Sequence, residues 1–383
     1  MEYRRLGASG LKVSPICLGT MMFGGRTSEK DSARIISHAR GAGINFIDTA
    51  DGYNKGESER IVGRAIKKDR DDWVLATKVF VPMGDGPNQR GLSAKWIHQE
   101  CEASLKRLGT DYIDIYYFHK DDEETPLEES LEAAARLIAD GKIRYYGISN
   151  YYGWRQTLLC TTAEAMGVPL PVVCQPYYNA MTREAERDVL PSCEHFGLGV
   201  VPYSPLARGV LTAKYDPAKD PGKNTRAGAG DKRMLSTEWR PESLKLAQKV
   251  KKHAERRGMT AADWAVNWVL ANPVITAVLA ARAPCSSGSR TWARSTTWTT
   301  GRRRTRRSGI SWFRRAIRRR RATTTRSIRS GGGRCRRISV PVRHQIPGLR
   351  FVIFARRRLL RQHVKRNEVP YGPVAAEQWQ DQA

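Results

Sequence analysis

The sequence predicts an α/β protein of the (β/α)8 class, the TIM-barrel architecture, over residues 1–281. Eight short runs rich in β-branched and aromatic residues alternate there with stretches whose apolar residues recur at helical spacing. Eight strand–helix units in a segment of this length fit the ~250 residues typical of such a barrel. No Gly-x-Gly-x-x-Gly motif follows the first predicted strand, which argues against a doubly wound sheet.

Local start and stop signals support the predicted helices. Ser28 and the Thr125-Pro126 pair precede helical stretches, as helix-starting residues commonly do. Glycine readily adopts the left-handed conformation that ends helices, and Gly43, Gly109, Gly141, Gly167 and Gly197 stand where helices should stop. We expect strands over residues 13–18, 45–50, 73–79, 112–119, 144–150, 172–179, 198–204 and 275–280, and helices that include 58–68, 94–108, 127–139 and 261–270.

One predicted connection is much longer than the others. Residues 207–240 are rich in Gly, Lys, Asp and Pro and follow the seventh predicted strand. A long irregular loop inside a compact domain is more often functional than incidental. We therefore expect this segment to act as a lid over the functional face.

Polar residues stand where three neighbouring predicted strands end. Asp48 and Tyr53 follow the second strand, Lys78 ends the third, and His119 ends the fourth. In a barrel the carboxyl ends of the strands share one face, and chemistry takes place there. Each residue alone could be structural, and Asp48 and Lys78 could simply be a structural ion pair inside the barrel. The four together predict an active site.

These four residues match the motif that defines the aldo-keto reductases, and the sequence resembles that superfamily from Tyr3 to about Ala281. Further matching segments follow strands one, five, six and seven: Leu18-Gly19-Thr20, Gly147-Ile148-Ser149-Asn150, Gln175-Pro176-Tyr177-Tyr178-Asn179 and the run from Tyr203 to Gly209. The resemblance implies an NADPH-dependent oxidoreductase that reduces an aldehyde or ketone to the alcohol. It does not specify which small-molecule carbonyl is the substrate.

The chemistry of carbonyl reduction explains the four catalytic residues. The reaction needs a proton on the oxygen as negative charge develops there. Tyrosine is a weak acid with a pKa of ~10, and a neighbouring ammonium favours its phenolate. We therefore expect Tyr53 to donate the proton, Lys78 to lower its pKa, and Asp48 to orient and compensate Lys78. His119 would hydrogen-bond the carbonyl oxygen.

The same resemblance implies a set of cofactor contacts. Ser149, Asn150 and Gln175 would hold the nicotinamide carboxamide, and Tyr203 would stack on the nicotinamide ring. Some of these residues could instead be structural: Ser149 and Asn150 as helix caps, Tyr203 as a core residue and Gly209 as a turn glycine. The loop after strand seven would wrap the pyrophosphate. The full predicted set is Gly19, Thr20, Met21, Ser149, Asn150, Gln175, Tyr203, Ser204, Pro205, Leu206, Arg208 and Gly209, with no metal site.

Charge is distributed very unevenly along the chain. Of the formal net charge of +28, +24 falls in residues 282–383, which contain 26 Arg and 1 Lys against three acidic residues. Residues 1–281 therefore have the charge of an ordinary enzyme, and no specific nucleic-acid partner is expected. Seven cysteines without a Cys-x-x-Cys pair, no apolar signal region and no long apolar run predict a cytoplasmic protein outside the membrane. The pattern leaves the oligomeric state open.

The resemblance stops where the eighth helix should begin. Family members follow strand eight with a Gly-Pro-Arg-type loop and a helix, whereas residues 282–383 form an Arg-rich segment that we expect to be a disordered, separate tail. Adding one nucleotide to a back-translation of residues 278–284 restores Val-Leu-Ala-Gly-Pro-Arg-Thr. We therefore attribute the tail to a reading-frame error, which would leave an impaired product. The alternative for the tail is a basic arm that binds nucleic acid.

A second function remains open for the barrel itself. The potassium-channel β subunits share the fold and the four catalytic residues, so those residues do not separate an enzyme from a regulatory NADPH-binding barrel.

Overall fold

The eight predicted strands form one parallel sheet in the computed structural model, which describes residues 1–223 and 225–280. The strand order is β10-β3-β4-β5-β6-β7-β8-β9, and a parallel bridge between Val200 and Ile275 joins the two ends of the sheet. The predicted (β/α)8 barrel is confirmed. Its strands are β3 (Ile16–Gly19), β4 (Phe46–Asp48), β5 (Val74–Val79), β6 (Ile113–Phe118), β7 (Ile143–Ser149), β8 (Val173–Gln175), β9 (Gly199–Val200) and β10 (Val278–Ala280).

Alternate residues of each strand serve two different cores. Ala76 and Ile115 belong to the apolar cluster inside the barrel, whereas Leu75 and Tyr116 belong to the cluster between sheet and helices. Successive strand side chains point to opposite faces, so each strand of a barrel is buried on both sides. This explains why the strands are nearly continuous apolar runs in the sequence.

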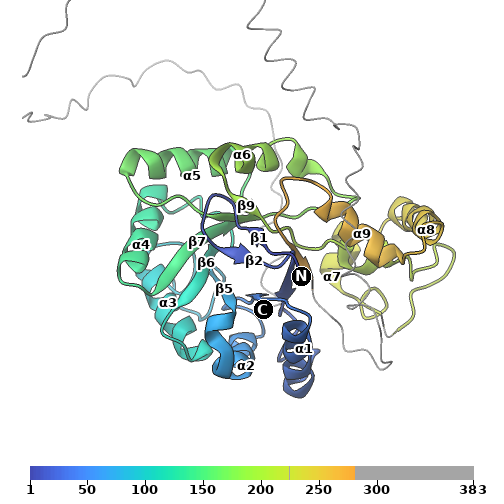
Figure 1. Ribbon diagram of the computed structural model, residues 1–383, viewed down its shortest axis with the longest axis horizontal. Helices are drawn as coiled ribbons and strands as arrows, with labels where there is room; N and C mark the ends of the chain where they lie inside the picture. Colours follow the sequence, from blue (N-terminus) through green and yellow to red (C-terminus); the bar gives the residue numbers. More distant parts are fainter. Residues whose placement is uncertain (224, 281–383) are drawn as a thin grey trace, which may run out of the picture. The chain divides into compact units, whose positions relative to one another are not determined.

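A helix follows each of the strands β3 to β8, and these helices succeed one another around the sheet (Figure 1). Ser28 accepts a hydrogen bond from the backbone of Asp31 at the start of the first, and Ser93 caps the third in the same way. Gly109, Gly167 and Gly197 are left-handed caps, as predicted. The helices are α1 (Glu29–Gly41), α2 (Glu57–Ile66), α3 (Ala94–Leu108), α4 (Leu127–Ala139), α5 (Gly153–Met166) and α6 (Val189–Phe196), with short 3-10 turns η1 (Lys67–Asp72) and η2 (Glu184–Glu186).

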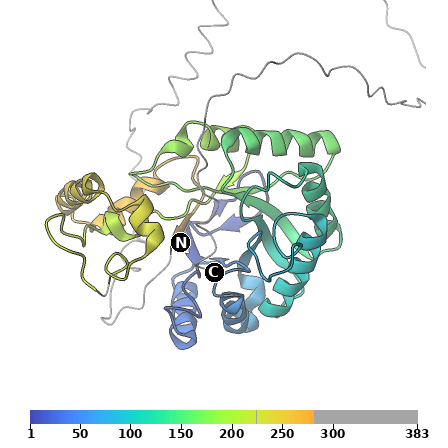
Figure 2. The same ribbon diagram turned by 180° about the vertical axis from the view of Figure 1, so that it is seen from behind.

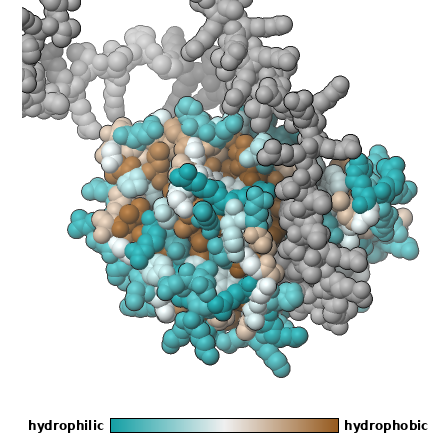
Figure 3. Space-filling model, in the orientation of Figure 1, coloured by the Kyte–Doolittle hydropathy of each residue, from teal (hydrophilic) through white to brown (hydrophobic). Residues whose placement is uncertain are grey.

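The outward faces of these helices are polar. In Figure 3 hydrophilic residues line much of the rim of the face that is shown. A ring of amphipathic helices produces this pattern, because each helix turns its apolar side to the sheet.

An N-terminal hairpin was not predicted. Strands β1 (Arg4–Arg5) and β2 (Lys12–Val13) pair antiparallel, so the predicted strand 13–18 is in fact two separate strands. The hairpin lies across the middle of the ring in Figure 1. Ala8 donates to the carbonyl of Gly197 over 2.7 Å, and Arg4 donates to the carbonyl of Ile275 over 3.1 Å. Both acceptors precede strands, so the hairpin covers the amino ends, away from the predicted site.

The long connection after β9 is more ordered than a loop. It contains η3 (Ala207–Thr212) and α7 (Lys232–Thr237) and leads into α8 (Pro241–Glu255) and α9 (Ala261–Leu270). These elements lie together at one side of the barrel in both ribbon views (Figures 1 and 2). They share an apolar cluster of their own, which includes Leu211, Met234 and Leu244. The expected irregular loop is therefore found only in part: residues 213–223 and 225–231 form no helix or strand, whereas apolar residues of η3 and α7 pack against α8.

The predicted tail and the predicted lack of an eighth helix concern residues 282–383, which lie outside the described residues. Within the part that is described, no helix is long and apolar enough to cross a membrane.

Candidate active site

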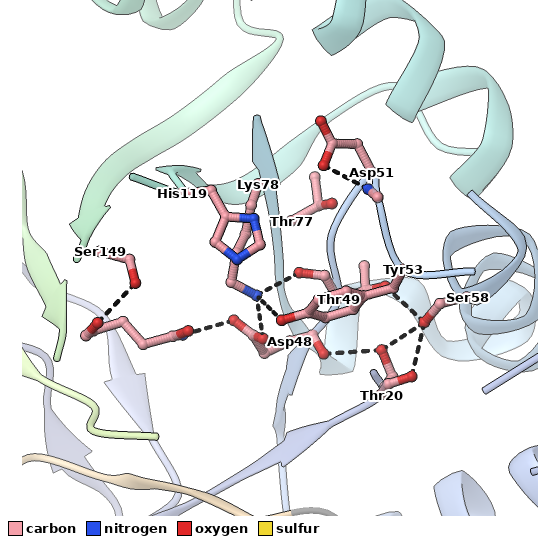
Figure 4. Close-up of polar contacts among 12 residues, drawn as sticks. Thr20, Asp48, Thr49, Asp51, Tyr53, Ser58, Thr77, Lys78, His119 and Ser149 are labelled. Atoms are coloured by element: carbon pink, nitrogen blue, oxygen red, sulfur yellow. Dashed lines mark hydrogen bonds and ion pairs between the residues drawn. The ribbon is translucent and has the colours of Figure 1, made fainter. Parts of the chain in front are cut away.

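The four predicted catalytic residues meet at the carboxyl ends of three neighbouring strands (Figure 4). Asp48 ends β4, Lys78 is the penultimate residue of β5, and His119 directly follows β6. Tyr53 lies on the turn after β4, which doubles back through left-handed Asn54 and Lys55. Parallel pairing of β4 with β5 and of β5 with β6 brings these positions to one edge.

Lys78 lies at the centre of the group. Its fully buried ammonium pairs with Asp48 Oδ1, donates to the Thr49 carbonyl over 2.7 Å and lies 3.3 Å from Tyr53 Oη. Burial lowers the pKa of Lys78, but the charge of Asp48 and the contact with Tyr53 raise it more, so the net pKa is above its ordinary value. Lys78 is therefore a fixed positive charge beside the phenol.

The pKa of Tyr53 differs in net direction from the prediction. Burial raises this pKa, and although the charge of Lys78 lowers it as expected, the net value is above the usual 10. The physical reason is that the turn that brings the phenol close to Lys78 also buries it away from water, and burial disfavours the charged phenolate. Tyr53 is accordingly protonated at neutral pH, and Lys78 is placed to stabilise the phenolate once the proton has left.

His119 is a neutral imidazole. Its ring stands edge-on to the Tyr53 ring, with centroids 6.0 Å apart. Burial and the positive charges of Lys78 and Arg233 hold the pKa of His119 well below 6.5. A neutral ring keeps one N–H donor and one acceptor nitrogen, so His119 can hydrogen-bond an oxygen without adding charge.

A hydrogen-bonded chain links the predicted carboxamide-binding residues to the predicted catalytic residues. Gln175 Nε2 donates to Asp48 Oδ2 over 2.9 Å, and Ser149 Oγ donates to the Gln175 carbonyl over 2.8 Å. Asn150 Nδ2 donates to the His119 carbonyl over 2.8 Å. The three residues thus lie around the site as predicted, and their side chains contact the protein itself in this structure.

Tyr203 also lies at the site, with one ring face covered. Its hydroxyl donates to Asn150 Oδ1 over 2.8 Å, and its ring stacks on Tyr177 with centroids 5.3 Å apart. Since Tyr177 packs against one face only, the arrangement suits a second flat ring on the other. Tyr177 is a contact that the sequence interpretation included in a motif but gave no role.

The residues after β3 help to build the site. Thr20 Oγ1 donates to the Asp48 carbonyl over 3.0 Å and also contacts Ser58 Oγ, which contacts Thr49 Oγ1. Gly19 lies within β3, where an added Cβ would be 3.2 Å from the Leu279 side chain, and Met21 is exposed. The hydroxyl of Thr20 therefore fixes the β4 turn in this structure.

The backbone after β9 is unusually contorted. Ser204 and Arg208 have left-handed φ values of 56° and 50°, and Gly209 has a φ of 102°. Left-handed non-glycine residues cluster at functional sites, because surrounding structure must hold them there. Pro205 is buried and Leu206 half-buried in the same turn. The predicted phosphate-binding residues thus form one strained turn at the site.

Three arginines gather beside this turn. The Arg208 side chain is 7% exposed, and burial together with the charges of Arg233 and Arg226 lowers its pKa to about 10. Arg233 lies on α7, and its charge also acts on Tyr53, His119 and Tyr203. Sequence reasoning marked the 207–240 segment as functional but missed Arg233 and Arg226, because nothing local shows which arginines lie near enough to act on Arg208.

Comparison with known proteins gives the family. Residues 15–285 match the aldo/keto reductase family. The chain belongs to the aldo/keto reductase family.

Several relatives of this aldo/keto reductase are named. It is 40% identical over 288 residues to the uncharacterized oxidoreductase YrpG of Bacillus subtilis, and the match covers 72% of this chain and 86% of that protein. It is 36% identical over 284 residues to a probable voltage-gated potassium channel subunit beta of Arabidopsis thaliana, covering 73% and 86%. It is 33% identical over 291 residues to the L-glyceraldehyde 3-phosphate reductase of Escherichia coli K12, covering 73% and 83%.

The family match ends close to the predicted boundary at residue 281, so the departure of the C-terminal part is confirmed. A reading-frame error as its cause stays a prediction. Among residues 1–223 and 225–280, no group of three or more metal-ligating side chains occurs.

Proposed function

We propose that this aldo/keto reductase reduces an aldehyde or ketone to the alcohol, with NADPH as its cofactor and a small-molecule carbonyl as its substrate. The observation that carries the proposal is the position of Lys78 Nζ, bonded to Asp48 and 3.3 Å from Tyr53 Oη, beside a neutral His119. An acid that is protonated at neutral pH and a fixed cation behind it are what oxygen protonation requires.

The donor set of the site fits such a cofactor. Arg208 Nε is buried and, among the described residues, has no hydrogen-bond partner, and the positive charges of Arg233 and Arg226 act on it. A buried cation of this kind calls for an anion such as a pyrophosphate. The amides of Asn150 and Gln175 offer donors and acceptors to a carboxamide, and the Tyr203 ring offers a stacking face.

NADPH, when bound, supplies the hydride. The residues of the chain then position and protonate the carbonyl oxygen of the substrate. His119 hydrogen-bonds the carbonyl oxygen, and Tyr53 Oη delivers a proton to it as negative charge grows. Lys78 stabilises the resulting phenolate, and Asp48 holds Lys78 in place with Gln175 on its second oxygen. The tyrosine regains its proton from solvent before the next turnover.

A direct assay tests the proposal. The full chain is incubated with NADPH and 4-nitrobenzaldehyde, and the loss of NADPH absorbance is followed. We expect turnover that depends on Tyr53. Tight NADPH binding without turnover would instead favour a regulatory barrel, the alternative that the Arabidopsis thaliana relative's name raises. If the chain shows neither NADPH binding nor turnover, this result would point to the impaired, frame-shifted product.

The cellular setting is also a proposal. The five cysteines among the described residues are buried free thiols. Reduced thiols favour a cytoplasmic enzyme, and we propose no specific nucleic-acid partner despite the basic C-terminal residues. Sequencing the source DNA across codons 275–295 tests the frame-error hypothesis, which a well-supported in-frame reading would remove.

A further inference from the structure

Glu238 is a buried carboxyl at the C-terminal end of α7, and none of the roles described so far uses it. The residue is 3% exposed. Tyr177 Oη donates a hydrogen bond to its Oε1 atom, and the same oxygen lies 3.8 Å from Arg208 Nε. Tyr177 is the ring that stacks on Tyr203. Glu238 therefore touches both the support of the stacking ring and the strained turn.

The charged groups that act on Arg208 include a second carboxylate, that of Asp231. Asp231, the other nearby carboxylate, already pairs with Arg226 over 2.8 Å and caps the backbone of Met234. Arg226 and Arg233 are both close enough to Arg208 to lower its pKa. Glu238 also approaches the Arg208 guanidinium in this structure, without reaching hydrogen-bond distance.

Glu238 can change its charge near neutral pH. Burial raises the pKa of Glu238 to about 7, with the charge of Arg240 working in the opposite direction. The facing groups are Tyr177 on the β8 side, Arg208 on the turn after β9, and Arg240 just beyond α7. Proton loss therefore adds a negative charge directly beside Arg208.

We propose that Glu238 is an internal counter-anion that competes with the phosphates of the cofactor for Arg208 and so sets the affinity of the site for NADPH. This inference rests on the proposed function. Its physical basis is that a buried cation with several cationic neighbours gains from either anion, and the two anions repel each other across a short distance.

The direction of the pH effect follows from the charge. Below the pKa of Glu238 the carboxyl is neutral, so it neither holds Arg208 nor repels a phosphate. As pH rises through about 7, the ionised form does both, and NADPH binding should weaken relative to a protein without this charge. Comparison with a variant is essential, because the 2′-phosphate of NADPH titrates in the same range.

The variant is Glu238→Gln, in which an amide oxygen can still accept from Tyr177 Oη. We expect the full-length variant to bind NADPH about tenfold more tightly than wild type at about pH 8, and within about twofold at about pH 6. Dissociation constants come from quenching of intrinsic fluorescence, and thermal melting verifies that both proteins are folded. Inorganic pyrophosphate, used as a competitor, should show the same preference.

The chain offers a matched control. Glu186 accepts from Tyr178 Oη over 2.7 Å and pairs with Arg183 over 2.7 Å, so it repeats the Glu–Tyr–Arg arrangement away from the turn after β9. Glu186→Gln should leave NADPH affinity unchanged at both pH values. In an Arg208→Gln background the gain from Glu238→Gln should disappear, because the two residues act on one another.

Each outcome decides the matter. Equal or weaker NADPH binding by Glu238→Gln at about pH 8, or a gain that persists without Arg208, overturns the counter-anion role while leaving the proposed function intact. Absence of NADPH binding by wild type and variant overturns the proposed function and this inference together.

Discussion

Gln175 donates a hydrogen bond to Asp48 across the mouth of the barrel, over 2.9 Å and between residues 127 positions apart. Their strands, β8 and β4, are four places apart in a ring of eight and therefore face each other. Lys78 bonds one oxygen of the Asp48 carboxylate and Gln175 bonds the other. The buried carboxylate is thus satisfied from two sides, which fixes Lys78 below Tyr53.

Replacing Gln175 should destabilise the fold as well as the site. In Gln175→Leu one oxygen of a fully buried carboxylate loses its donor, which costs ~1–3 kcal/mol. Gln175→Glu places a second carboxyl against the Asp48 carboxylate and should be the more destabilising variant at high pH, where the introduced carboxyl ionises. Urea unfolding at two pH values measures both effects. Unchanged stability in both variants would show that water replaces Gln175 at no cost.

Tyr53→Phe should abolish most carbonyl reduction while leaving the NADPH dissociation constant within a few-fold. The phenol supplies the proton, and loss of a general acid typically lowers the rate by ~10²–10⁴-fold. Steady-state kinetics and fluorescence titration separate the two quantities. Tyr152→Phe, at an exposed tyrosine, is the control. Wild-type turnover by Tyr53→Phe would remove this residue from its proposed role.

Removing only Lys78 from the buried ion pair should lower the free energy of unfolding more than removing both charges. Lys78→Met leaves the Asp48 carboxylate buried without its cation, and such a change typically costs ~3–5 kcal/mol. The double variant Asp48→Asn with Lys78→Met removes both charges and should recover part of that loss. Denaturant unfolding of the two single variants and the double variant gives the coupling free energy. Simple additivity would mean that the pair contributes nothing to stability.

Asp51 should make the protein less stable as pH rises. Burial, together with the charges of Glu59 and Glu100, holds the pKa of Asp51 well above its ordinary 3.8, and its Oδ1 accepts from the backbone of Gly52 over 2.6 Å. Below the unfolded-state pKa both states are protonated. Above it the unfolded chain releases its proton first, so this contribution to stability decreases progressively as pH rises from the unfolded-state pKa to the folded-state pKa of Asp51.

Asp51→Asn keeps an acceptor for Gly52 and cannot titrate. Its free energy of unfolding should therefore rise relative to wild type between about pH 4 and neutral pH. Urea unfolding across this range measures the difference. A constant difference at all pH values would show that Asp51 is ionised in the folded protein.

Sequence alone pointed to the four proposed catalytic residues because each is tied to a local feature. Asp48, Lys78 and His119 stand at the ends of apolar strand runs, and parallel strands bring such ends to one edge wherever they pair. The hairpin of β1 and β2 escaped notice because two-residue strands are too short to show alternation. In the same way, the apolar residues of the 207–240 segment have no regular period, and only packing against α8 reveals their order.

The sequence by itself determined which strands form the barrel and which side chains gather at its mouth, since hydrophobic periodicity and strand ends can be recognised from consecutive residues. The tertiary structure decided what those side chains do to one another. Burial outweighs Lys78 in setting the pKa of Tyr53, Gln175 reaches Asp48 from the opposite strand, and Glu238 comes within 3.8 Å of Arg208. Desolvation and charge interaction depend on distances between residues remote in the chain, and only the folded barrel sets those distances.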